Sequence, residues 1–342
     1  MGIKDIGWVN VMVALLEIRE KLVRFYGKND AYVTPLVKFL LSFVSFTLIN
    51  ANIGYMTKLN SMPVVIILAA VCSIIPINGM ITLAALVILL HLYELSLEVC
   101  LVGFLLFVFI YFVYFRFSPK YGYNAVLMPV CFKLGIPYIV PIGSGLLGEA
   151  YSMISVVCGS VVYFFLNGVH ANEATLGGTT EGGTSKIAIA INQLVGNREM
   201  YLVIAVFALA TLVVYIVRRM EIDNAWVVAW ISGIIFETIG LIAGYILLGI
   251  SGKVVGVILG GFVSCVLACM IQFLFFNVDY TRTERLQFED DEYYYYVKAV
   301  PKAVIAGSDK QIKHFNKKSD EKERMTKKRF AEEMDIDEDL LK

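Results

Sequence analysis

Between Asp30 and Asp223 the sequence contains no aspartate, and lysine and arginine are sparse in the same stretch. Charged residues make up 17% of the 342-residue chain, against about 25% in soluble globular proteins. Hydrophobic residues make up 58%. A soluble protein of this size needs polar residues to cover its surface. Because this stretch cannot supply them, we expect lipid to cover it.

The sequence also lacks the usual signatures of enzymes. It has three histidines, none of them in an HExxH motif, and no serine stands in a G-x-S-x-G elbow. The missing aspartates exclude aspartyl proteolysis and aspartate-bound magnesium over residues 31–222. We therefore expect no enzyme, metal site or cofactor. The formal net charge is zero, which by itself says nothing about nucleic acid, and we expect no nucleic-acid partner.

Six apolar segments reach or approach the roughly 20 residues that a helix needs to cross a bilayer. They are residues 36–56, 97–116, 150–168, 200–217, 225–249 and 254–277. Before them, Ile6–Phe25 is predicted to be an amphipathic helix that lies at the membrane interface or packs on the protein. The first 30 residues lack the apolar core of a cleaved secretory signal.

Two further apolar stretches are interrupted. Residues 62–93 contain the runs Met62–Ile75 and Met80–Leu92, separated by Pro76-Ile-Asn-Gly79. Residues 123–148 are broken at 133–137 and again at Pro141. Each stretch can be a re-entrant hairpin or a pair of short spans. The total is then 6, 8 or 10 spans, of which we favour 8 to 10 crossings or near-crossings.

Basic residues near the span ends predict the orientation. The basic flanks are Arg19, Lys21, Arg24 and Lys28; Arg116 and Lys120; Arg218 and Arg219; and Arg282 and Arg285. All four should be cytoplasmic, which leaves the loop 170–198, with its flexible-linker stretch Leu176–Ser185, on the other side. We expect an all-α polytopic protein of the cell membrane with both termini in the cytoplasm. It divides into an N-terminal helix (1–30), a membrane domain (31–277) and a charged tail (278–342).

Glu237 is the strongest single candidate for a functional residue. It stands near the middle of an apolar span, where a carboxylate is costly and usually faces a bundle interior, a water cavity or a partner. It could couple transport to an ion or proton, with Lys133, His91 or Lys38 as its partner. The alternative is a hydrogen-bonded structural glutamate that fixes helix packing.

Interrupted helices in two halves of a chain are typical of transporters in which the breaks meet near the midplane. On this hypothesis the substrate or ion pathway is formed by residues at the breaks together with the intramembrane polar groups. These candidates are Glu237, Lys133, His91, Pro76, Gly79, Gly135 and Pro137. The alternative is that the proline and glycine residues simply end short helices.

Glycines recur at four-residue spacing on the last two spans. They are Gly240, Gly244, Gly252, Gly256 and Gly260. Such spacing permits close approach of helices, and we expect packing within the chain rather than dimerisation.

The tail contains an acidic cluster beside four tyrosines, and Phe288–Pro301 is predicted to be one strand. A solitary strand is not stable, so it should pair with another segment, a second subunit or a partner. The candidate partner-binding residues are Glu289, Asp290, Asp291, Tyr293, Tyr294, Tyr295 and Tyr296. Residues 309–342 mix basic and acidic residues and are either solvated or docked to anionic lipid or a partner.

The segment Phe288–Pro301 and the stretch from Ile136-Pro-Tyr-Ile-Val-Pro141 to Gly145-Leu-Leu-Gly148 resemble uncharacterised polytopic proteins of clostridial-type Gram-positive bacteria. These are sometimes labelled ABC-transporter-permease-like. The resemblance implies no settled activity, and the cytoplasmic loops contain no coupling motif for an ATPase subunit. Glu237 and the interrupted segments predict a transport protein, a permease subunit or secondary carrier of unknown substrate, with an ATPase or assembly factor as possible partner of the tail. The alternative is a membrane anchor that recruits an assembly factor through its tail.

Overall fold

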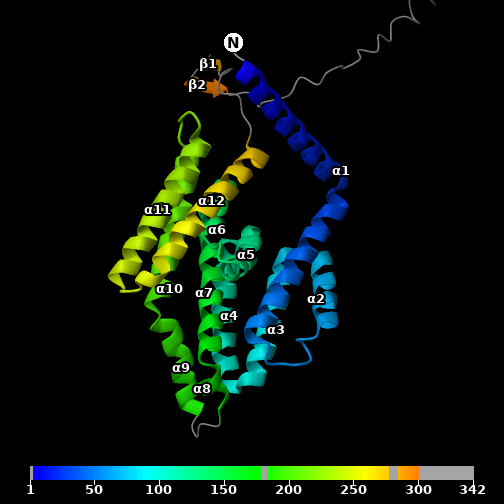
Figure 1. The fold of residues 1–342 in the computed structure, drawn as a ribbon, viewed down its shortest axis with the longest axis vertical. Coiled ribbons are helices and arrows are strands. Elements are labelled where there is room, and N and C mark those ends of the chain that lie inside the picture. Colours follow the sequence, from blue (N-terminus) through cyan, green and yellow to red (C-terminus); the bar gives the residue numbers. More distant parts are fainter. Residues whose placement is uncertain (1–2, 179–182, 277–283, 291, 300–342) are drawn as a thin grey trace, which may run out of the picture. The chain divides into compact units, whose positions relative to one another are not determined.

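Helices dominate the computed structural model, which describes residues 3–178, 183–276, 284–290 and 292–299 (Figure 1). The chain divides into two compact units, one of Met1–Glu17 with Val304–Lys342 and one of Ile18–Ala303. In the first unit only the beginning of helix α1 (Ile3–Ile53) is described. The described residues from Ile18 onward belong to the second unit.

Seven helical segments of the described chain are long and apolar enough to cross a membrane. They are Ala14–Ile53, Ile77–Leu95, Leu97–Phe117, Ser152–Ala171, Lys186–Arg218, Ala225–Leu247 and Val254–Phe275. The chain is therefore a multi-pass helical membrane protein, as its composition predicted.

Every helix after α1 is shorter than α1. After α1 the helices are α2 (Met62–Ile74), α3 (Ile77–Leu95), α4 (Leu97–Phe117), α5 (Gly122–Lys133), α6 (Ile139–Leu147), α7 (Ser152–Ala171), α8 (Glu173–Gly177), α9 (Gly183–Val195), α10 (Arg198–Arg218), α11 (Ala225–Leu247) and α12 (Val254–Phe275). Two 3₁₀ turns, Pro119–Tyr121 and Ser251–Lys253, precede α5 and α12.

The amphipathic segment and the first span are two helical parts of α1 that meet at a kink. The dihedral angles of Asn29 at the kink are non-helical (φ −119°, ψ 23°). The Asn29 side-chain amide donates to the carbonyl of Phe25, 3.0 Å away. That carbonyl is the acceptor the Asn29 backbone would use in a regular helix, so the side chain competes with the backbone and kinks the helix.

The first interrupted region differs from its prediction. The break falls at Ile75 and Pro76, and Gly79 lies in the first turn of α3. Helix α3 is therefore 19 residues long and reaches spanning length, while α2 has 13 residues. Pro76 lies directly before the first residue of α3. A backbone N–H at this position has no acceptor within the helix, so its absence in proline costs no hydrogen bond.

The second interrupted region is a hairpin of two helices that are too short to cross a bilayer. Helix α5 has 12 residues and α6 has nine, so they extend about 18 and 14 Å against a hydrocarbon thickness of about 30 Å. Helix α5 packs on α3 and α7, and α6 packs on α7, α10, α11 and α12 (Figure 1). The α5–α6 hairpin thus lies among the long helices as a re-entrant segment.

Contacts between connections define the two ends of the bundle. At one end, the Tyr55 hydroxyl lies 3.3 Å from the Glu173 carboxylate, beside the turn between α3 and α4. At the other end, the rings of Tyr121 and Tyr151 are 5.5 Å apart and Arg218 donates to the carbonyl of Gly148 at 2.9 Å. The α5–α6 hairpin begins and finishes at this second end.

The loop 170–198 is more ordered than its linker composition suggested. Helix α8 covers Glu173–Gly177, and α9 runs from Gly183 to Val195, directly before α10. Residues 179–182 of the predicted flexible stretch lie outside the described residues.

The tail forms a hairpin rather than one strand. Strands β1 (Glu284–Glu289) and β2 (Tyr294–Ala299) pair antiparallel, with Phe288 opposite Tyr295. The later part of the predicted strand therefore pairs with the segment directly before it, and Asp290 and Glu292 lie between the two strands. Asp291 and residues 300–342 lie outside the described residues.

The recurrent glycines divide into two groups. A side chain on Gly240 would meet Val206, one on Gly244 would meet Leu202, and one on Gly260 would meet the Tyr138 ring at 2.1 Å. Around Gly252 and Gly256 there is open space within 4 Å. The predicted packing role is therefore wrong for Gly252 and Gly256, whose helix face is exposed.

Gly260 and Gly256 make a matched pair for testing this packing. We expect Gly260→Ala to lower the free energy of unfolding of the purified protein by roughly 1–3 kcal/mol, because the new methyl group must displace the Tyr138 ring. Gly256→Ala should be neutral or slightly stabilising, since alanine favours helix. Melting curves in detergent measure both; equal shifts would contradict the assignment.

Candidate intramembrane site

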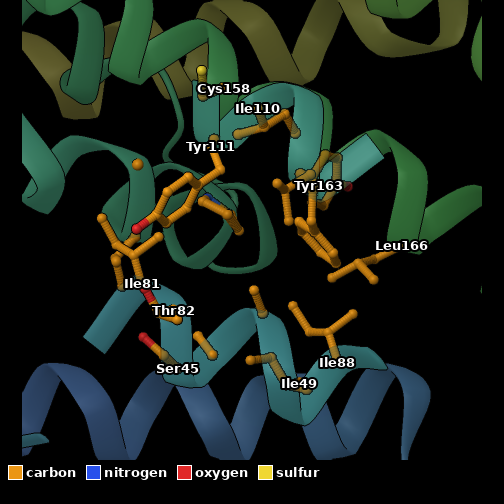
Figure 2. Close-up of a pocket in the computed structure, with 18 of the residues that line it drawn as sticks. Ser45, Ile49, Ile81, Thr82, Ile88, Ile110, Tyr111, Cys158, Tyr163 and Leu166 are labelled. Carbon is orange, nitrogen blue, oxygen red and sulfur yellow. The ribbon is translucent and has the colours of Figure 1, made fainter. Parts of the chain in front are cut away.

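A cavity of about 360 Å³ lies between helices α1, α3, α4, α5 and α7 (Figure 2). Aliphatic and aromatic side chains form nearly all of its wall, among them Ile49, Ile88, Ile110 and Leu166. Its size falls in the range of small-molecule sites, about 300–1,000 Å³.

Lys133 is the charged residue among the side chains that line the cavity. It is the last residue of α5, and the chain turns directly after it. The N–H of Ile136 donates to Cys131 O at 2.9 Å and that of Gly135 to Phe132 O at 3.2 Å, with Gly135 at φ +77°. This is a Schellman motif, which ends a helix at a left-handed residue where glycine is favoured. Gly135 therefore fixes where Lys133 stands.

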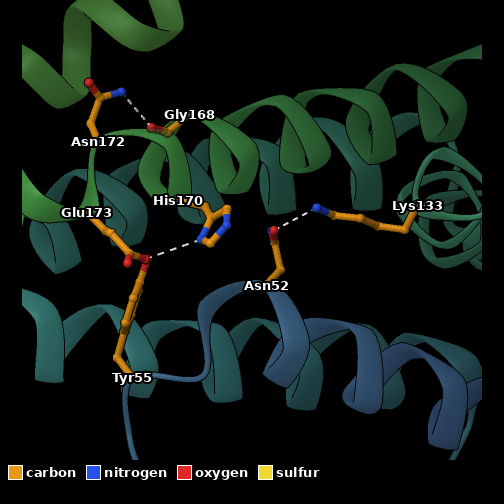
Figure 3. Close-up of polar contacts among 7 residues, drawn as sticks. All are labelled: Asn52, Tyr55, Lys133, Gly168, His170, Asn172 and Glu173. Atoms are coloured by element: carbon orange, nitrogen blue, oxygen red, sulfur yellow. Dashed lines mark hydrogen bonds and ion pairs between the residues drawn. The ribbon is translucent and has the colours of Figure 1, made fainter.

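The Lys133 ammonium group has a neutral partner. Its Nζ donates to Asn52 Oδ1 at 2.6 Å and lies 5.8 Å from the centre of the Tyr163 ring (Figure 3). No aspartate or glutamate lines the cavity, and Lys133 forms no ion pair within the described residues. An ammonium group has three donors, so two remain after the bond to Asn52.

Three hydroxyl groups of the cavity wall donate within the protein. Ser45 donates to Leu41 O at 2.7 Å, and Thr82 donates to Asn78 O at 3.0 Å. The Tyr114 hydroxyl lies 2.7 Å from Asn78 Oδ1 and 3.0 Å from Pro119 O, both acceptors. Tyr111 and Tyr163 also line the cavity, so the charged donor Lys133 shares the wall with two tyrosines.

The cavity opens towards the side of the bundle. Leu86 of α3 and Phe104 and Phe112 of α4 line it and are 52%, 53% and 71% exposed. These helices are membrane-spanning by length and composition, so side chains exposed on them face acyl chains. A ligand could therefore reach the cavity from within the bilayer.

His91 is buried at the end of the bundle where α1 finishes. Its Nδ1 accepts from the backbone N–H of Met56 at 3.2 Å, which leaves Nε2 to donate to Asn50 Oδ1 at 3.0 Å. A neutral imidazole satisfies both bonds, whereas a protonated ring would lose the Met56 bond. The structure thus places this predicted pathway residue in a connection that holds the loop after α1.

Glu237 is not bonded to any of its predicted partners. Lys133 bonds to Asn52, and Lys38 bonds to the carbonyl of Ile75. His91 bonds to Asn50 and Met56. Glu237 is 1% exposed on α11, and neither carboxyl oxygen has a hydrogen-bond partner in the described chain. The glycines that pack α11 on α10, Gly233, Gly240 and Gly244, lie one to two turns from it. An unpartnered carboxyl group is costly to bury, so it needs a proton or a ligand cation.

Tyr138 ties the α5–α6 hairpin to the helices that pack around α11. It is the residue before α6, and its ring lies against Gly260 of α12 and Phe207 of α10. The turn Leu134–Tyr138 therefore has Lys133 on one side, facing the cavity, and Tyr138 on the other, packed on the two helices beside α11.

The two breaks have different neighbours and are not brought together by their contacts. Asn78, beside Pro76 and Gly79, accepts from Tyr114, which also contacts the 3₁₀ turn at Pro119. The turn that holds Gly135 and Pro137 follows Lys133, whose ammonium bonds near the end of α1. These contacts give no support to the expectation that the breaks meet near the midplane, which stays a prediction.

Some residues that shape the site escaped the sequence interpretation. Asn52 was treated as part of a plain span, and Tyr138 as part of a motif without a role. Arg218 was assigned only to a cytoplasmic flank, yet it donates to the carbonyls of Leu146 and Gly148 at the end of α6. An asparagine in the last turn of a span is the signal that could have marked the cavity.

No protein-family model, curated protein or solved structure matches this chain. The resemblance drawn from the sequence therefore stays an expectation, and the site must be interpreted from its own geometry.

Replacing Glu237 tests whether its carboxyl group serves packing. We expect Glu237→Met to leave thermal stability unchanged or to raise it by roughly 1 kcal/mol, because it removes a buried group without a partner. Glu199→Met is the control, since Glu199 bonds to Lys253 at 2.5 Å and to Tyr245 at 3.3 Å. The control should melt lower. A similar loss in both variants would favour a structural glutamate.

Proposed function

We propose that this chain is a membrane transport protein, a permease subunit or secondary carrier, of the cell membrane, with both termini in the cytoplasm. The observation that carries the proposal is the laterally open cavity beside the α5–α6 hairpin, with the Lys133 ammonium on its wall. A purely structural bundle has no need to keep a cation beside an apolar space of this size.

The ligand would bind by replacing a weak partner. Asn52 is neutral, so an anionic group would compete well for the Lys133 donors, because it adds an attraction between opposite charges that the amide oxygen lacks. Binding at Lys133 would then act on the turn Leu134–Tyr138. Because Lys133 ends α5 and Tyr138 precedes α6, displacement of the turn would reach the packing around Gly260.

Glu237 would supply the coupling. In the described conformation its carboxyl group has no partner, so it can hold a proton; in an alternative conformation that admits water or a cation, it could release that proton. Helix α11, which carries Glu237, packs on α6 and α12, so a change in the packing around Glu237 would reach the α5–α6 hairpin. This gives a physical route between the carboxyl group and the Lys133 cavity without direct contact.

Transport can be tested without knowing the solute. Proteoliposomes loaded with an unlabelled small-molecule extract of the expressing cells are given the same extract made from ¹⁴C-labelled cells. We expect labelled solute to accumulate by counterflow through the intact chain. Glu237→Gln should lower net accumulation driven by a pH gradient at least tenfold, and Lys133→Gln should lower counterflow, because one removes the exchangeable proton and the other the charge.

The controls are Glu94→Gln and Lys58→Gln, which change exposed residues of the same types. Uptake by the intact chain that equals uptake by empty liposomes would contradict the proposal. Normal gradient-driven uptake by Glu237→Gln would remove the carboxyl group from the mechanism.

The β1–β2 hairpin favours a second function, recruitment of a protein to the membrane. Tyr293, Tyr294, Tyr295 and Tyr296 are 61%, 62%, 46% and 79% exposed. Aromatic side chains are enriched at protein interfaces. The backbone N–H groups of Glu292 and Tyr293 donate to Asp290 and hold the pKa of its carboxyl group below its usual range. The turn is therefore organised to present the tyrosines.

Two truncations separate the hairpin from the rest of the tail. If the hairpin recruits a partner, removing 284–342 should abolish co-purification of cytoplasmic proteins with the full membrane domain. Removing 300–342 keeps both strands and should preserve it. Quantitative mass spectrometry of the purified complexes provides the measurement. Loss in both truncations would assign recruitment to residues 300–342, and loss in neither would contradict this function.

A further inference from the structure

We infer that the cavity beside Lys133 binds an amphipathic anion, a molecule with one hydrocarbon chain and a carboxylate or phosphate head group. The inference rests on the proposed function, because it names the substrate class of the same site. It follows from three separate properties of the cavity: its charge, its wall and its opening.

The charge selects an anion. Lys133 keeps two donors after bonding to Asn52, and no acidic side chain lines the cavity to balance its charge. The wall hydroxyls of Ser45, Thr82 and Tyr114 donate to acceptors within the protein, whereas Tyr111 and Tyr163 also line the cavity. The Lys133 ammonium group would attract an anionic head group and repel a cationic one.

The wall selects a hydrocarbon chain. Away from Lys133 the cavity is enclosed by aliphatic and aromatic side chains of α1, α3, α4 and α7, as Figure 2 shows for Ile49, Ile88, Ile110 and Leu166. A small hydrophilic anion would lose its hydration and gain few polar contacts in return. A chain that fills the apolar space offsets that loss because it makes many dispersion contacts.

The opening selects a molecule already dissolved in the membrane. The exposed lining residues Leu86, Phe104 and Phe112 border the side of the cavity on α3 and α4. A single-chain amphiphile can move from the acyl region into the cavity without crossing water. A double-chain phospholipid fits less well, since about 360 Å³ is small for two full chains.

Photo-crosslinking of the full-length protein tests this inference. The protein in phosphatidylcholine nanodiscs is irradiated with a palmitic acid analogue that carries a diazirine in mid-chain, and modified peptides are identified by mass spectrometry. We expect modification of peptides from α1, α3, α4 or α7 that line the cavity. Unlabelled palmitate and hexadecyl phosphate should both compete, whereas hexadecanol and acetate should not.

Lys133→Gln should lower specific labelling about tenfold or more, the loss expected for a charge-assisted hydrogen bond. Lys58→Gln, at an exposed lysine, is the matched control and should not change it. Ala85→Trp keeps Lys133 but fills the cavity, so it should also block labelling while the melting temperature shows that the protein folds. The relative competition by palmitate and hexadecyl phosphate identifies the head group as carboxylate or phosphate.

Unchanged labelling of Lys133→Gln, equal competition by hexadecanol, or the absence of labelled cavity peptides would each overturn the inference. The outcome is separable from that of the transport assay. Specific labelling without any uptake of cell extract supports the binding site and removes the proposed transport function. Uptake of extract by a protein whose cavity is not labelled leaves transport standing and overturns the substrate class.

Discussion

Backbone carbonyl groups at the ends of helices must find donors, and this requirement organises how the short helices join the bundle. Two short helices, α2 and α6, each receive a cation from a neighbouring long helix. Lys38 of α1 donates to Ile75 O after α2, 3.3 Å away, and Arg218 of α10 donates to Leu146 and Gly148 at the end of α6. A cation there also complements the helix dipole.

Lys133 stands out against these two cations. Helix α5 ends in a Schellman motif that satisfies its last carbonyls through the chain itself, so Lys133 is not needed for capping. It reaches instead to the side chain of Asn52 on the cavity wall. Lys38 and Arg218 therefore hold the fold together, while Lys133 is available to a ligand. This difference depends on how each helix ends, which is why the positive charges of the membrane domain are not equivalent.

The apolar spans could be predicted well, because a bilayer demands long uninterrupted hydrophobic runs. The starts of α4, α10, α11 and α12 fall within two residues of the expected boundaries. The interrupted regions were harder. Composition alone placed Gly79 in the break between two apolar runs. In the structure Pro76 sets the start of α3, so the residues from 77 to 79 belong to its first turn.

The candidate site could be predicted only as separate residues. Glu237 and Lys133 were both recognised as unusual charges, yet sequence does not reveal that Asn52 meets Lys133 or that Glu237 lacks a partner. These facts depend on how five helices far apart in the chain pack together. The glycines make the same point: Gly256 and Gly260 look equivalent in sequence, but only Gly260 faces the Tyr138 ring.

The account depends most on the α5–α6 hairpin turning back within the membrane, since this brings Lys133 to the cavity. Labelling of single cysteines with a membrane-impermeant thiol reagent, in a chain without other cysteines, tests it directly. Cysteines replacing Lys120 and Glu149 should react from the same side of the membrane, and one replacing Leu134 should react from neither. Reaction of the Leu134 cysteine from the opposite side, or of the two outer cysteines from different sides, would contradict the account.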